Sequence, residues 1–138
     1  MCKNGKPPLV KGDACFVCGQ SNPDGLRLKF DIDPDRHRAF SSMKIPARYQ
    51  GWDDITHGGF IATLLDEVCV HAAKTFGSLP VTAELTVSFK KPVGLETEVF
   101  LVAEAEKKSG RLVESRGRLE IDGVVHAEAT AKVVLMKN

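Results

Sequence analysis

The chain contains 138 residues, of which 43% are hydrophobic and 27% are charged, a composition that fits a single globular domain with one core. Its 19 basic and 18 acidic residues give a formal net charge of +1, which gives no sign of a basic nucleic-acid-binding surface. No apolar run approaches the roughly 20 residues of a membrane span, and the first residues lack the apolar core of a signal peptide. We therefore expect a cytoplasmic protein with reduced thiols and no nucleic-acid or membrane partner.

The chain begins with a polar stretch, residues 1–13, that contains two consecutive prolines and predicts a flexible lead. The remainder, residues 14–138, is then a single domain. Alternation of apolar and polar residues, broken by Gly, Pro, Asn and Asp, predicts its strands. Asp122 and Gly123 give the strongest hairpin signal, because a type I′ turn needs positive φ at both central residues. The predicted strands are residues 26–33, 39–45, 81–89, 99–106, 112–121 and 124–135.

A C-x-x-C motif formed by Cys15 and Cys18 follows the lead. A zinc site normally takes four ligands, and the sequence has no second pair of this kind. We therefore expect no bound metal and a turn packed by two thiols. Two alternatives stay open: a metal site completed by Cys2, His37 or a symmetry-related chain, and a redox pair.

Residues 60–76 form the one long segment with helical periodicity. Apolar residues fill most of its circumference, which is typical of a buried helix wrapped by other elements. The short connections after this helix favour antiparallel strand neighbours. We therefore predict an α+β fold in which a curved antiparallel sheet of five to six strands wraps one long central helix.

The start of this helix combines His57 with two glycines, Gly58 and Gly59. N–H groups of a first helical turn lack intrahelical partners and carry the positive end of the dipole, and glycine lets another molecule approach them. An N–H group there can form an oxyanion hole, and the histidine is expected to order the turn by hydrogen bonds. Two acids, Asp66 and Glu67, lie in the middle of this helix. A carboxylate on an apolar helix is expected either to face water or to be retained for a function, because burying it without a partner is costly.

Residues 57–66 contain H-G-G and an acid nine positions after the histidine, and this pattern resembles the signature of hotdog-fold acyl-CoA thioesterases of the PaaI type. Residues 81–92 resemble the second block of that family, and residues 15–26 resemble a header of one branch. The resemblance implies a hotdog fold and hydrolysis of a small or medium acyl- or aryl-CoA thioester. It implies no cofactor beyond the coenzyme A of the substrate, and a homodimer that pairs into a dimer of dimers, with active sites at the subunit boundary.

The resemblance also implies roles for single residues. Gly58 N–H would polarise the substrate carbonyl, and Asp66 of the partner subunit would act as nucleophile or general base. Thr82 matches a position where relatives orient water or the carboxylate, although a threonine also simply favours a strand. Relatives often carry Asn or Gln six residues before the histidine; here that position is Gly51, and Gln50 precedes it.

Several residues are further candidates for substrate binding. Trp52 is expected either in the core, the preferred interpretation, or in an acyl pocket. Four cationic side chains could meet the phosphates of coenzyme A, although such charges are more often solvated. The alternative function is a hotdog protein that senses acyl-CoA without hydrolysing it. The substrate-binding candidates are Gly59, Glu67, Trp52, Lys90, Lys91, Arg116 and Arg118.

Overall fold

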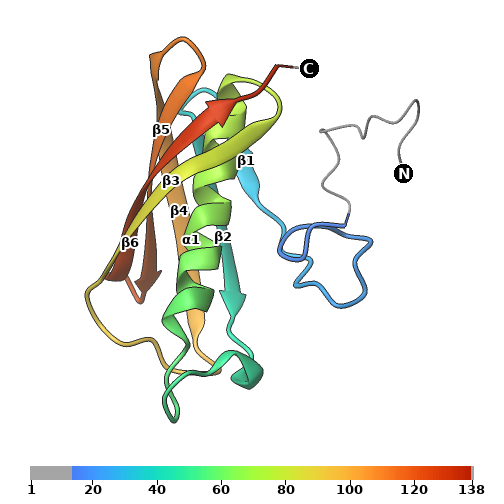
Figure 1. The fold of residues 1–138 in the computed structure, drawn as a ribbon. Coiled ribbons are helices and arrows are strands. Elements are labelled where there is room, and N and C mark those ends of the chain that lie inside the picture. The colour runs from blue at the N-terminus through green and yellow to red at the C-terminus, as the bar shows by residue number, and fades with distance from the viewer. Residues whose placement is uncertain (1–13, 138) are drawn as a thin grey trace.

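One antiparallel sheet of six strands curls around a long helix in the computed structural model, which describes residues 14–137 (Figure 1). The lead predicted for residues 1–13 lies outside the described residues. The strand order is β1-β2-β4-β5-β6-β3, so β3 crosses over to the far edge instead of pairing with β4. The strands are β1 Asp31–Asp33, β2 Arg38–Lys44, β3 Pro80–Phe89, β4 Glu98–Ser109, β5 Leu112–Ile121 and β6 Val124–Leu135.

The central helix α1, Gly58–Ala73, continues as a 3-10 turn, η2, Lys74–Phe76. It begins two residues earlier than predicted because His57 caps it and draws both glycines into the first turn. Its apolar residues fill the core beneath the sheet, as the periodicity predicts. Within residues 14–137 no helix is long and apolar enough to cross a membrane. The buried helix residues are Phe60, Ile61, Leu64, Leu65, Val68, Cys69, Ala72 and Ala73.

The helix lies close against β5. A Cβ added at Gly117 would stand 2.9 Å from Cys69 Sγ, so only glycine allows this approach without a shift. The buried Ser115 hydroxyl donates a 2.8 Å hydrogen bond to the Cys69 carbonyl. Helix and sheet are therefore joined by a polar contact as well as by apolar packing.

The first predicted strand, residues 26–33, is wrong for most of its length, since only Asp31–Asp33 pair with β2. The alternation that suggested it reflects real burial, because Leu28 is only 8% exposed. Its N–H donates instead to the carbonyl of Val17 at 2.8 Å. The other five strands match their predicted positions to within three residues, and Asp122 and Gly123 both have the positive φ of the predicted turn.

Strand β3 is a long edge strand. It pairs with β6 on one side, and its other side faces no strand among residues 14–137. Val81 and Phe89 on this strand are 50% and 55% exposed. Exposed apolar edges of this kind favour pairing with another chain.

Candidate active site

The start of α1 presents a backbone donor that has no hydrogen-bond partner in the described part of the chain. The His57 ring caps the helix, because its Nδ1 accepts a 2.8 Å hydrogen bond from Gly59 N–H, and its carbonyl accepts from Phe60 N–H at 3.0 Å. Among residues 14–137, no hydrogen bond uses the N–H of Gly58, the first helical residue. A helix of 16 residues lies behind that donor, so the position favours a developing negative charge.

His57 orders this turn through both its ring and its backbone. Since Nδ1 accepts a hydrogen bond, the proton of the neutral ring lies on Nε2, and the backbone N–H donates to the Tyr49 carbonyl at 2.8 Å. A Cβ at Gly59 would lie 3.0 Å from Nδ1, whereas a Cβ at Gly58 would meet only the Phe89 ring at 3.5 Å. A side chain at Gly59 would therefore make the His57 ring shift by a few tenths of an ångström, whereas one at Gly58 would not.

The loop before the helix explains why this chain departs from the family pattern at Gly51. A Cβ there would lie 3.2 Å from His57 Cα and 3.3 Å from Cδ2, so a longer side chain would displace the histidine. The neighbouring Gln50 uses its Oε1 to accept a 3.0 Å hydrogen bond from Asp54 N–H. One end of its amide therefore closes the loop.

Two open depressions flank His57. The first has a volume of about 470 Å³ and is lined by Gly51, Trp52, Thr56, His57 and Gly58. The second has a volume of about 380 Å³ and is lined by Arg48, Tyr49, Gln50, His57, Gly59, Phe60 and Thr63. Trp52 is 85% exposed, so its predicted core position is wrong: the loop turns its indole outward, and the residue lines the first depression together with Gly58.

Asp66 faces the edge of the sheet. Its half-buried carboxylate accepts a 2.6 Å hydrogen bond from the Thr82 hydroxyl of β3. No other hydrogen bond among residues 14–137 uses this carboxylate. Asp66 lies eight positions after Gly58, which corresponds to about 12 Å along the helix axis. One chain therefore cannot place both groups on the same carbonyl carbon.

Glu67 faces a different element from its neighbour and lines neither depression. Its Oε2 lies 3.3 Å from His71 Nε2 and 3.8 Å from Cys15 Sγ. Burial acts to raise the pKa of Glu67, but hydrogen bonds from His71 and Cys18 outweigh burial and lower it. Glu67 therefore lies at the turn that carries Cys15 and Cys18, away from the turn at His57.

Lys90 and Lys91 follow β3 directly, next to Phe89, whose ring meets Gly58. Both backbone N–H groups donate to the His126 carbonyl, at 2.8 and 3.0 Å, which fixes the turn. Lys90 Nζ lies 3.7 Å from a carboxylate oxygen of Glu128. These two cations are therefore on the helix-start side of the molecule.

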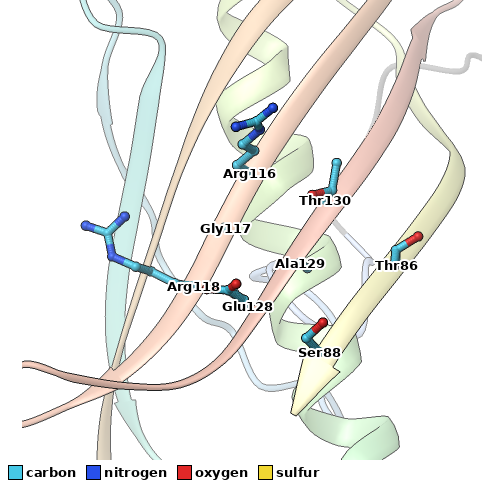
Figure 2. A pocket seen from close by; sticks show the side chains of 8 residues that line it. All are labelled: Thr86, Ser88, Arg116, Gly117, Arg118, Glu128, Ala129 and Thr130. Atoms are coloured by element: carbon cyan, nitrogen blue, oxygen red, sulfur yellow. The ribbon is translucent and has the colours of Figure 1, made fainter. Parts of the chain in front are cut away.

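Arg116 and Arg118 lie elsewhere, on the outer face of β5 (Figure 2). Between them, Gly117 faces the helix, so the arginines point away from it. A cavity of about 380 Å³ lies on this outer face, where Arg116 pairs with Glu114 at 3.5 Å and Arg118 bonds to Glu120. The cavity is lined by Thr86, Ser88, Arg116, Gly117, Arg118, Glu128, Ala129 and Thr130.

Sequence reasoning missed two aromatic contacts at the helix start. The rings of Tyr49 and Phe60 stack with centroids 4.0 Å apart, and the Phe89 ring lies 3.5 Å from the position that a Cβ on Gly58 would take. The helical periodicity indicates burial of Phe60, but no local pattern joins it to a residue of the preceding loop. Phe89 lies far along the chain, so only the fold brings it to Gly58.

Comparison with known proteins identifies the class. A family model described as "Thioesterase superfamily" matches residues 54–127. The acyl-coenzyme A thioesterase THEM4 of Xenopus laevis is 30% identical over 131 residues, which cover 92% of this chain and 59% of that protein. This chain therefore spans about three fifths of the length of that relative.

Solved structures show the same architecture. The crystal structure of a thioesterase superfamily protein has a TM-score of 0.80 at 24% identity, covering 88% of this chain and 60% of that one. A variant of the phenylacetic acid degradation protein PaaI from Thermus thermophilus has a TM-score of 0.72 at 24% identity, covering 79% and 93%.

A curved sheet wrapped around one helix, with an open donor at the helix start, defines this protein as a hotdog-fold protein. The match over residues 54–127 places the chain in the thioesterase superfamily. The family resemblance drawn from H-G-G and its spaced acid is thereby confirmed, since that pattern lies within the matched segment.

Proposed function

We propose that the protein is an acyl-CoA thioesterase that hydrolyses a small or medium acyl- or aryl-CoA thioester. The observation that carries the proposal is the N–H of Gly58 at the head of a 16-residue helix, which has no hydrogen-bond partner within residues 14–137, in a residue that lines a depression of about 470 Å³. A thioester carbonyl bound there gains negative charge as it is attacked, and a preorganised N–H donor stabilises that charge. The family membership and the name of the Xenopus relative agree with this chemistry.

The acid that completes the site comes from a second copy of the chain. Thr82, which holds Asp66, and Phe89, whose ring lies near Gly58, stand toward opposite ends of the exposed edge of β3. Antiparallel pairing of two β3 strands, centred between residues 85 and 86, sets Thr82 opposite Phe89 of the partner subunit. Each Asp66 then approaches the helix start of the other chain. We propose this homodimer, paired again into a dimer of dimers, as the active form.

The reaction follows from these positions. Either Asp66 removes a proton from water that attacks the carbonyl carbon, or its carboxylate attacks directly and water hydrolyses the resulting anhydride. In both routes the carbon–sulfur bond breaks, coenzyme A leaves as the thiol, and the acyl group leaves as a carboxylate. The Thr82 hydroxyl orients the carboxylate, and His57 keeps the donor turn in place.

The surroundings of the donor indicate the substrate class. Trp52 is the largest apolar side chain that lines the depression, and it can cover a short acyl chain or an aromatic ring. Lys90 and Lys91 lie on the same side and can meet coenzyme A phosphates. Ligand sites of this kind have volumes of about 300–1,000 Å³, a range that includes the depression beside Gly58.

A thiol-release assay over a panel of acyl-CoAs, from acetyl to long-chain and aromatic, tests the proposal. Asp66→Asn keeps the shape and the acceptor for Thr82 but removes the base, and we expect turnover to fall by about 10²–10⁴-fold. Asp122→Asn is the matched control, because asparagine suits the positive φ of that turn equally well. Tight acyl-CoA binding without thiol release by the wild type would contradict the proposal, and so would unchanged turnover in folded Asp66→Asn.

A further inference from the structure

The N-terminal segment places two thiols against the side of α1 that Asp66 does not use. The sulfur atoms of Cys15 and Cys18 and one carboxylate oxygen of Glu67 all lie within 4.8 Å of one another. Each of the three residues is half-buried. Two thiols and a carboxylate that converge in this way form a set of donors for a metal ion.

The surrounding backbone holds these donors in place. The turn carrying the thiols is closed by Gly19 N–H, which donates to the Cys15 carbonyl at 2.9 Å. Val17, between the two cysteines, is only 1% exposed and anchors the segment in the core. Leu28 N–H donates to the Val17 carbonyl at 2.8 Å. The thiols are therefore presented by a rigid segment instead of a loose tail.

His71 supplies the outer contact that a ligating carboxylate usually has. Its Nε2 lies 3.3 Å from Glu67 Oε2, and its ring stacks on Phe30 with centroids 4.4 Å apart. Metal-binding carboxylates are typically oriented by such hydrogen bonds. His37, which the sequence offers as an alternative ligand, bonds instead to Thr75 Oγ1 at 2.7 Å.

We propose that Cys15, Cys18 and Glu67 bind one zinc ion, which fastens the N-terminal segment to the middle of α1. In a tetrahedral zinc site the ligand atoms stand about 3.3–3.8 Å apart, so the three donors need to contract by only about 1 Å. Thiolates favour zinc over calcium or magnesium. Water occupies the fourth position, and binding releases the two thiol protons to solvent.

Electrostatics explains why a cation suits this cluster. The two sulfur atoms lie within 4.8 Å of a Glu67 carboxylate oxygen, and all three side chains are partly buried. A divalent cation placed among them stabilises both thiolates and the carboxylate at once.

The test is the zinc content of the full chain, expressed with added zinc and purified without chelator. We expect about one zinc per chain by elemental mass spectrometry and a large loss of zinc in the Cys15→Ser, Cys18→Ser double variant. Cys69→Ala is the matched control, because that thiol is buried against Gly117 on the other side of the helix; its zinc content should equal that of the wild type.

Cobalt substitution gives a second readout that does not depend on the double variant folding. Wild-type protein loaded with Co²⁺ should show a thiolate-to-cobalt charge-transfer band and tetrahedral ligand-field bands. Glu67→Gln should shift the ligand-field bands and keep the charge-transfer band. The proposal would be overturned if the wild-type protein contained no zinc after equilibration with excess zinc. It would also be overturned by zinc that persists in the double variant, or by a Cys15–Cys18 disulfide found in place of metal.

Discussion

Replacing Gly58 by proline removes the proposed oxyanion donor while leaving the helix intact. Proline is favoured at the first helical position, where its missing N–H would be unpaired in any case. It also requires extended backbone at the preceding residue, and His57 already has φ −61° and ψ 133°. The substitution is therefore expected to change the free energy of unfolding by no more than about 1 kcal/mol.

The expected loss of activity is much larger than this change in stability. One oxyanion-hole donor contributes about 2.7–4 kcal/mol to transition-state stabilisation, so kcat should fall by about 10²–10³-fold. Gly58→Ala is the control, because it keeps the N–H and adds a Cβ that meets only the Phe89 ring at 3.5 Å. That variant should retain kcat within a few-fold of the wild type.

The assay is thiol release from the best acyl-CoA of the panel, with kcat and KM determined separately and folding checked by thermal denaturation. Folded Gly58→Pro protein that keeps more than about a tenth of the wild-type kcat would contradict an oxyanion role for this N–H, because loss of one donor should lower kcat by about 10²–10³-fold. Equal losses of activity in Gly58→Ala and Gly58→Pro would also contradict it, because Gly58→Ala keeps the N–H.

Three further predictions follow from single contacts. Thr82→Val removes the 2.6 Å hydrogen bond to Asp66; we expect kcat to fall by about two- to tenfold, from a bond worth about 0.5–1.5 kcal/mol, and unchanged kcat would exclude an orienting role. Gly117→Ala places a Cβ 2.9 Å from Cys69 Sγ and should lower the free energy of unfolding, measured in urea, by about 1–3 kcal/mol. Adding Cys69→Ala to this variant should restore part of that loss. If the destabilising effects of the two substitutions simply add, the contact between these residues is contradicted. Trp52→Ala should leave stability within about 0.5 kcal/mol and raise KM for aryl-CoA, whereas a lowered melting temperature would indicate hidden packing.

The sequence predicts the helix and its histidine-capped start because both depend on neighbouring residues. Apolar residues recur every three or four positions along α1, and that periodicity is a local property. The cap is local too, since His57 accepts from Gly59, two residues away. The hairpin at Asp122 and Gly123 follows for the same reason, because only such residues readily adopt positive φ.

The sequence does not predict contacts that the fold makes between distant segments. Cys15 meets Glu67 across 52 residues, and no spacing rule spans that interval. The alternation near Leu28 identifies the buried side chains but not their backbone partner, which is a turn and not a strand. Trp52 is apolar enough for the core, but it belongs to a loop in which Gly51 N–H donates a 2.8 Å hydrogen bond to the Ile55 carbonyl. This closed loop holds Trp52 outside the core.

The bonds along the middle of α1 have a consequence for how the helix is oriented. A helix with apolar side chains on almost every side buries a similar apolar area at several rotations about its own axis. Asp66, Glu67 and the Cys69 carbonyl reach three separate parts of the fold, namely β3, the N-terminal turn and β5. Because these three hydrogen bonds point in different directions, they prevent rotation of the helix about its axis. The Asp66 carboxylate therefore keeps its orientation toward β3 even where the apolar packing alone would allow the helix to rotate.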